Sequence, residues 1–105
     1  MLPGRIDHLI DMLKTEQDDL FLNYALGIEY QSISNFVLAE KQFKKVISLD
    51  PDYIAAYYQL GKLFEEQLKN AEALAYYKSG LEKAKLKKDN KAINEFSEAI
   101  FMLED

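Results

Sequence analysis

Few side chains in this sequence could perform catalysis. It contains one histidine, His8, and no cysteine. A Ser/His or Cys/His catalytic arrangement needs further groups that position the imidazole, and a zinc site needs several nitrogen or sulfur ligands. No such partner motif accompanies His8, so we expect it to be a surface residue on a helix. The lack of cysteine also excludes disulfides, thiol nucleophiles and thiolate metal sites.

Two pairs of adjacent carboxylates are the remaining candidates for acid–base or metal chemistry. They are Asp18-Asp19 and Glu65-Glu66. Adjacent residues of a helix point to different faces, so neither pair converges on one ligand. Helix capping explains the aspartates, and a solvated helix face explains the glutamates. The sequence has neither a glycine-rich phosphate loop nor EF-hand spacing. We therefore expect no enzyme, no catalytic residue, no cofactor and no metal site; a divalent ion at Glu65 and Glu66 is the enzymatic alternative.

The composition is that of a globular helical protein. The chain has 105 residues, of which 49% are hydrophobic and 30% charged, with only four glycines and two prolines. This length predicts one domain, and the few glycines and prolines suit long helices with short connections. The longest apolar runs, residues 54–58 and 99–103, are far shorter than the roughly twenty residues that a bilayer span needs. No signal peptide is recognisable, so we expect a cytoplasmic protein without a membrane partner.

The charge of the chain argues against nucleic acid as a partner. The formal net charge is −5 at pH 7, and nucleic-acid binding depends mainly on neutralising phosphates. One basic run departs from this balance: Lys83, Lys85, Lys87, Lys88 and Lys91. A solvated helix C-terminus explains it, because cations complement the helix dipole there. A site for an anion or an acidic partner is the alternative.

A repeated pattern organises the rest of the chain. Its first copy consists of Asn23, Leu26, Gly27, Tyr30, Ala39, Phe43 and Pro51. The second copy follows at one constant offset, with Tyr57, Leu60, Gly61, Phe64, Ala73 and Tyr77. An aromatic residue, Leu-Gly, Tyr, Ala, Phe and Pro on a period of about 34 residues form the signature of the tetratricopeptide repeat (TPR). The chain resembles this family over about residues 20–87.

The resemblance implies an all-α fold, an α-α superhelix in the form of a right-handed TPR solenoid. About six antiparallel helices are expected, over residues 5–16, 19–32, 36–49, 52–67, 71–88 and 91–103. A single TPR domain of residues 1–105 would then hold an N-terminal helix at 5–16, repeats at 20–53 and 54–87, and a C-terminal capping helix at 91–103. Leu9 lies one repeat period before Phe43, so the first helix matches the second helix of a truncated repeat. We expect the chain to be complete as it stands.

Three places depart from the family pattern. Leu68-Lys69-Asn70 replaces the usual Gly-Asp/Asn-aromatic turn, which makes the turn geometry doubtful unless Asn70 caps the next helix. Lys85 replaces the closing proline of the second repeat, so that helix can continue. Asn94-Glu95 stands where a third Leu-Gly pair would fall, and the last helix therefore resembles the solvating helix that ends TPR arrays.

The family resemblance also implies a concave groove lined by the first helix of each pair. The groove positions of the first repeat are Phe21, Tyr24, Ala25, Ile28 and Gln31. Those of the second repeat are Ala55, Tyr58, Gln59, Lys62 and Glu65, and Ile93 and Phe96 would close the far end. Large aromatic side chains such as Tyr24 and Tyr58 make good peptide anchors, because they offer much area at little entropic cost. Burial between helices is the alternative for both tyrosines.

The partner implied by the resemblance is a peptide or helix of another protein. One TPR subtype binds acidic chaperone C-termini through a clamp of Lys, Asn and Arg. The matching positions here are Tyr24, Ile28, Gln59, Asp89 and Ile93, and none is cationic, which argues against that ligand. A structural alternative is a homodimer formed through the last helix, with Phe101 and Met102 in the interface.

Overall fold

The computed structural model describes residues 4–104. Over this range the secondary structure is entirely α-helical, and the predicted all-α class with six helices is confirmed. The helices are α1 (Arg5–Thr15), α2 (Leu20–Ser32), α3 (Phe36–Leu49), α4 (Ile54–Glu66), α5 (Asn70–Lys87) and α6 (Asn90–Glu104). Each begins and ends within two residues of the range expected from the sequence.

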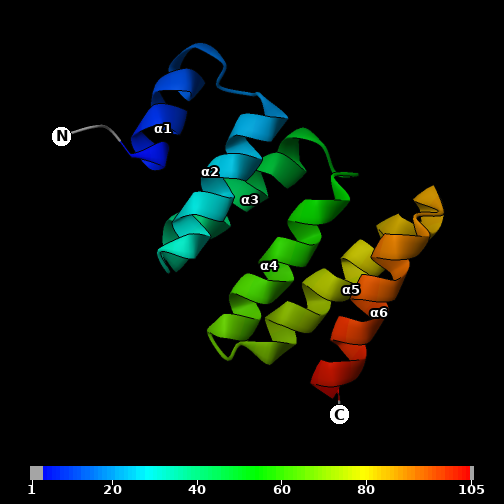
Figure 1. Ribbon diagram of the computed structural model, residues 1–105. Helices are drawn as coiled ribbons and strands as arrows, with labels where there is room; N and C mark the ends of the chain where they lie inside the picture. The colour runs from blue at the N-terminus through cyan, green and yellow to red at the C-terminus, as the bar shows by residue number, and fades with distance from the viewer. Residues whose placement is uncertain (1–3, 105) are drawn as a thin grey trace. The chain divides into compact units, whose positions relative to one another are not determined.

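The chain forms two compact units that are divided between Pro51 and Asp52. Unit 1 contains α1, α2 and α3, with α2 packed against both of the others (Figure 1). Unit 2 contains α4, α5 and α6, with α5 packed against both of the others. The division falls close to the predicted boundary between the two repeats, and the assignment of residues 1–105 to one TPR domain remains a prediction.

Side-chain caps fix the starts of three helices. Asp19, Asn35 and Asp89 each accept a hydrogen bond from the backbone N–H three residues later, at 2.8, 3.2 and 3.1 Å. Such a bond satisfies one of the donors that the first helical turn leaves unpaired. Asp18, the other predicted cap of α2, instead lies 3.9 Å from the Lys45 ammonium group.

Helices α2, α4 and α5 end in the same left-handed turn. Ser34, Leu68 and Lys88 adopt φ values of 59°, 60° and 57°. After α4, the Lys69 N–H donates to the Phe64 carbonyl at 2.9 Å, and the Leu68 N–H donates to the Glu65 carbonyl at 2.9 Å. This pair of bonds is the Schellman motif. The turn that the sequence made doubtful therefore keeps regular geometry, although a leucine occupies its left-handed position.

The prediction that Asn70 caps α5 was wrong. Asn70 is the first residue of the helix, and Lys69 occupies the N-cap position without a side-chain hydrogen bond. Lysine has no acceptor atom in its side chain, so it cannot bind the free N–H groups of the first turn. This turn therefore lacks the capping bond that Asn35 supplies at the corresponding place in unit 1.

Three glycines let aromatic rings approach a facing helix closely. A Cβ atom added to Gly27 would lie 2.6 Å from the Phe43 ring. A Cβ on Gly61 would collide with the Tyr77 ring, and one on Gly80 would collide with the Phe96 ring. Each ring follows its glycine at the same spacing along the chain. The Gly-aromatic contacts thus join α2 to α3, α4 to α5, and α5 to α6.

The last helix is displaced from the register of the repeat. Helices α2 and α4 begin one repeat period apart, at Leu20 and Ile54. Helix α6 begins at Asn90, two positions later than the same period would place it. Helix α5 has 18 residues against 14 in α3, because no proline stops it. Phe96-Ser97 therefore occupies the Leu-Gly position, and the prediction that Asn94-Glu95 does so was wrong.

The first helix is packed less tightly than the others. None of its described residues is fully buried. Among its apolar side chains, Ile6, Leu9 and Leu13 are half-buried, while Ile10 is exposed. His8 is exposed, as expected. An ion pair of 3.7 Å between Arg5 and Glu29 also links α1 to α2.

We expect Gly61→Ala to destabilise the protein by about 2 kcal/mol, because the added methyl group displaces the buried Tyr77 ring. Chemical denaturation measures the change in the free energy of unfolding. Gly4→Ala is the matched control, since a Cβ there would meet no atom within 4 Å. Equal stability of the two variants would contradict the close-approach role of Gly61.

We expect Leu68→Gly to stabilise the protein by about 1 kcal/mol, because glycine adopts positive φ without steric cost. The leucine side chain is 86% exposed, so little packing is lost. Leu86→Gly is the control, since Leu86 is 79% exposed but lies within α5. There the same exchange should destabilise by up to about 1 kcal/mol. Thermal or chemical unfolding of both variants tests the opposite signs, and a destabilised Leu68→Gly would contradict the interpretation.

Candidate functional site

The predicted groove residues of the first repeat all lie on α2 in unit 1. Phe21 is exposed, whereas Tyr24, Ile28 and Gln31 are half-buried. Phe21 lines a hollow of about 400 Å³ between α1 and α2. The Tyr24 ring packs on the buried Phe43 ring, with the centroids 5.7 Å apart. Phe43 therefore contacts both Gly27 and Tyr24 in unit 1.

The predicted groove residues of the second repeat lie on α4 and line two hollows in unit 2. The first hollow has a volume of about 310 Å³ and includes Tyr58 and Gln59. The second has about 490 Å³ and includes Tyr58, Lys62 and Glu65. Both also include Glu95 of α6, so they adjoin at Tyr58 and Glu95. We call these two hollows together the Tyr58 groove.

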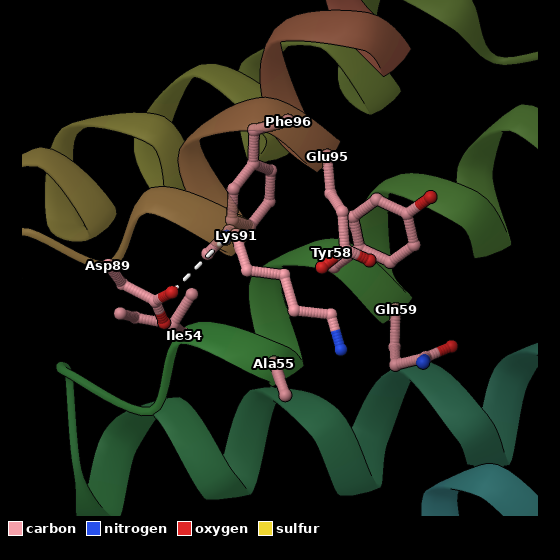
Figure 2. A pocket seen from close by; sticks show the side chains of 9 residues that line it. Ile54, Ala55, Tyr58, Gln59, Asp89, Lys91, Glu95 and Phe96 are labelled. Atoms are coloured by element: carbon pink, nitrogen blue, oxygen red, sulfur yellow. Dashed lines mark hydrogen bonds between the residues drawn. The ribbon is translucent and has the colours of Figure 1, made fainter.

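The first hollow lies between the N-terminal halves of α4 and α6. Figure 2 shows Ile54, Ala55, Tyr58 and Gln59 of α4 facing Lys91, Glu95 and Phe96 of α6. Asp89 closes one end, where its carboxylate accepts the capping hydrogen bond from the Ala92 N–H. Apolar, amide and charged groups therefore meet in one concave surface, a combination that is typical of ligand pockets.

The second hollow continues along α4 and α6 and is rich in carboxylates. Its lining residues are Tyr58, Lys62, Glu65, Tyr77, Glu95, Glu98, Ala99 and Met102. The buried Tyr77 hydroxyl donates a hydrogen bond of 2.8 Å to a Glu65 carboxylate oxygen. Burial and this bond raise the pKa of Tyr77 far above its ordinary value. The phenol therefore stays neutral and holds the Glu65 carboxylate at the edge of the hollow.

Tyr58 is the residue that both hollows share, and it is held by two rings. Its ring centroid lies 5.7 Å from that of Tyr77 and 5.6 Å from that of Phe96. Tilted and edge-to-face contacts of this kind are favourable arrangements for aromatic pairs. Burial, followed by the charges of Glu95, Glu65 and Glu98, raises the pKa of Tyr58. The Tyr58 ring is thus half-buried and held by two neighbouring rings, with the charges of three glutamates acting on it.

Sequence reasoning missed Glu95 and Glu98, which line the groove from α6. With a strict repeat period, the residues matching Gln59 and Lys62 are Ile93 and Phe96. The later start of α6 makes them Glu95 and Glu98 instead. Phe96 is only 1% exposed and belongs mainly to the core. The missing proline at Lys85 and the late start expected for the last helix were the signals in the sequence that its register could change.

The corrected register also changes the comparison with the chaperone-binding clamp. Lys91 takes the position assigned to Asp89, and Glu95 takes that assigned to Ile93. Lys91 thus supplies a cation at one clamp position, but Glu95 places a carboxylate at the other. Glu95 would repel an acidic C-terminus, so the argument against that ligand class remains.

The structure adds little to the case for a metal, membrane or anion site. Within residues 4–104, no group of three or more His, Asp or Glu side chains could hold a metal ion. No helix in that range is long and apolar enough to cross a membrane. Of the basic run at the end of α5, Lys83 and Lys87 lie 3.4 and 3.8 Å from the Asp52 carboxylate. These two lysines therefore pair with the carboxylate of Asp52, which belongs to the same unit.

Comparisons with known proteins agree with this architecture. A solution structure of a protein from Bordetella parapertussis superposes with a TM-score of 0.87 at 26% identity, covering 98% of this chain and 90% of that one. A crystal structure of a TPR domain protein from Salinibacter ruber gives 0.75 at 34% identity, covering 82% and 96%. A crystal structure of MamA gives 0.77 at 31% identity and covers 80% of this chain but 49% of MamA. No family model matches the chain, and no curated protein matches it.

The helical pairs and their Gly-aromatic contacts define a helical-repeat protein of the kind that generally serves in protein–protein interaction. The similarity to the Salinibacter ruber domain extends over nearly all of that domain. The chain belongs to the tetratricopeptide repeat family.

Proposed function

We propose that this TPR protein is a non-catalytic adaptor that binds a peptide or helix of a partner protein in its concave groove. The observation that carries the proposal is Tyr58, which is half-buried at the junction of two hollows. A preorganised aromatic side chain loses little entropy on binding and offers a large contact area. Gln59 supplies an amide, and Lys62 and Glu65 supply charged groups, at the rim of the same groove.

The first repeat contributes the corresponding side chains of α2 in this proposal. Phe21 is an exposed apolar group beside a hollow, and Tyr24 is half-buried against Phe43. Ile28 and Gln31 follow on the same helix, at intervals of four and three residues. Residues with this spacing share one helix face. Each unit therefore offers a binding helix with an aromatic anchor.

The test is affinity capture from the native lysate with the wild type and with a Tyr24→Ala, Tyr58→Ala double variant. We expect the double variant to lose the partner by tenfold or more, since aromatic anchors at hot spots contribute about 2 kcal/mol or more. Tyr24→Phe, Tyr58→Phe is the matched control, which keeps both rings. Circular dichroism checks that each variant folds. Equal retention of a partner by a folded double-alanine variant would overturn the groove proposal.

A second candidate function is self-association through α6. Phe101 and Met102 are 70% and 69% exposed near the end of this helix. Ser97 of α6 takes the place that the glycine of the Leu-Gly pair has in the repeats. Gly61 is covered there by the Tyr77 ring, whereas Ser97 is exposed. This observation favours a helix face that a second copy of the chain could cover.

Light scattering at several protein concentrations tests the dimer. If it forms, Phe101→Asp should shift the wild-type mass from dimer to monomer, because a carboxylate would be buried without a partner. Val37→Asp is the control, since Val37 is also largely exposed but lies on α3. A wild type that stays monomeric at all concentrations would rule out this function.

A further inference from the structure

The second hollow of the Tyr58 groove has more negative than positive groups. Glu65 of α4 and Glu95 and Glu98 of α6 face one lysine, Lys62. Burial is the largest cause of the raised pKa of Tyr58, and the charges of these three carboxylates add to it. A concave surface with an excess of one charge concentrates groups of the opposite sign.

The carboxylates of this hollow are available for a partner. Within the part of the chain from residue 4 to residue 104, no ion pair shorter than 4.0 Å includes Glu65, Glu95 or Glu98. Three other glutamates of the described chain do form ion pairs: Glu29 with Arg5, Glu40 with Lys44 and Glu104 with Lys78. Glu65 uses one oxygen to accept from Tyr77, which orients the group without neutralising its charge.

The ring of Tyr58 adds a surface that accepts a cation. The Lys62 ammonium group already lies 6.0 Å from the ring centroid. That distance is at the outer limit of a favourable cation–π contact. A guanidinium or ammonium group that entered the hollow could approach the ring more closely and reach the carboxylates at the same time. Arginine would gain most, because its planar group both stacks on rings and pairs with carboxylates.

We propose that the Tyr58 groove selects a basic segment of its partner, with a Lys or Arg side chain in the second hollow against Tyr58 and among Glu65, Glu95 and Glu98. This inference rests on the proposed adaptor function and specifies the chemistry of the partner. The apolar part of the first hollow, formed by Ile54 and Ala55, takes the neighbouring residue of the same segment. An acidic segment meets like charge in the second hollow and is rejected.

Selection from a random peptide library displayed on phage tests the proposal directly. The wild type is the bait, and peptides that a Tyr58→Ala variant also retains are discarded. We expect the remaining peptides to be enriched in Arg and Lys relative to the unselected library. Peptides that need Tyr58 but show no basic enrichment would overturn this inference and leave the adaptor function standing. If the selection yields no peptide that depends on Tyr58, both the basic-segment inference and the adaptor function are overturned for this groove.

Binding of one selected peptide to charge variants then identifies the groups involved. Fluorescence anisotropy should show Glu95→Gln, Glu98→Gln weakening the peptide by roughly tenfold, since each exposed carboxylate contributes up to about fivefold. Glu82→Gln on α5 removes one exposed carboxylate outside the groove and should leave affinity unchanged within twofold. The loss in the double variant should shrink as NaCl is raised. An effect of Glu82→Gln as large as that of the groove variants would contradict the site and indicate attraction by net charge alone.

Discussion

The packing of this protein depends on contacts between aromatic rings and glycine backbone. Phe43 covers Gly27, Tyr77 covers Gly61 and Phe96 covers Gly80, each across a pair of neighbouring helices. A ring can occupy these places only because no Cβ fills them. The contact brings two helices close together and fixes which faces they turn toward each other. The same rings are among the most deeply buried side chains of the chain.

These rings also support the tyrosines of the proposed binding surface. Tyr77 and Phe96 bury one side against glycine and contact Tyr58 on another. The Tyr58 ring is therefore fixed by the core, although it belongs to the groove. In unit 1, Phe43 links Gly27 to Tyr24 in the same way. Core packing and the half-buried tyrosines are thus parts of one arrangement, in which the proposed anchor side chains are already ordered.

The length of α5 determines which charges reach the groove. Without a proline, the helix extends to Lys87 and ends at the left-handed Lys88. Helix α6 consequently begins two residues later than a strict repeat would place it. Glu95 and Glu98 then lie opposite α4, while Phe96 enters the core. A small difference in helix length therefore changes which charges line the Tyr58 groove, while the Gly-aromatic packing is kept.

The amino-acid sequence was enough to predict the number of helices, their bounds to within two residues, and the part of the core that the repeat signature forms. It could do so because the repeat signature consists of the packing residues themselves: Leu26 and Gly27 recur as Leu60 and Gly61, and both pairs are buried. The side chains that face the Tyr58 groove from α6 could be identified only once the helices were packed together. Groove residues do not take part in the signature, and their position depends on where α5 ends. That end is set by a left-handed turn at Lys88 and a cap at Asp89, which no repeat period encodes.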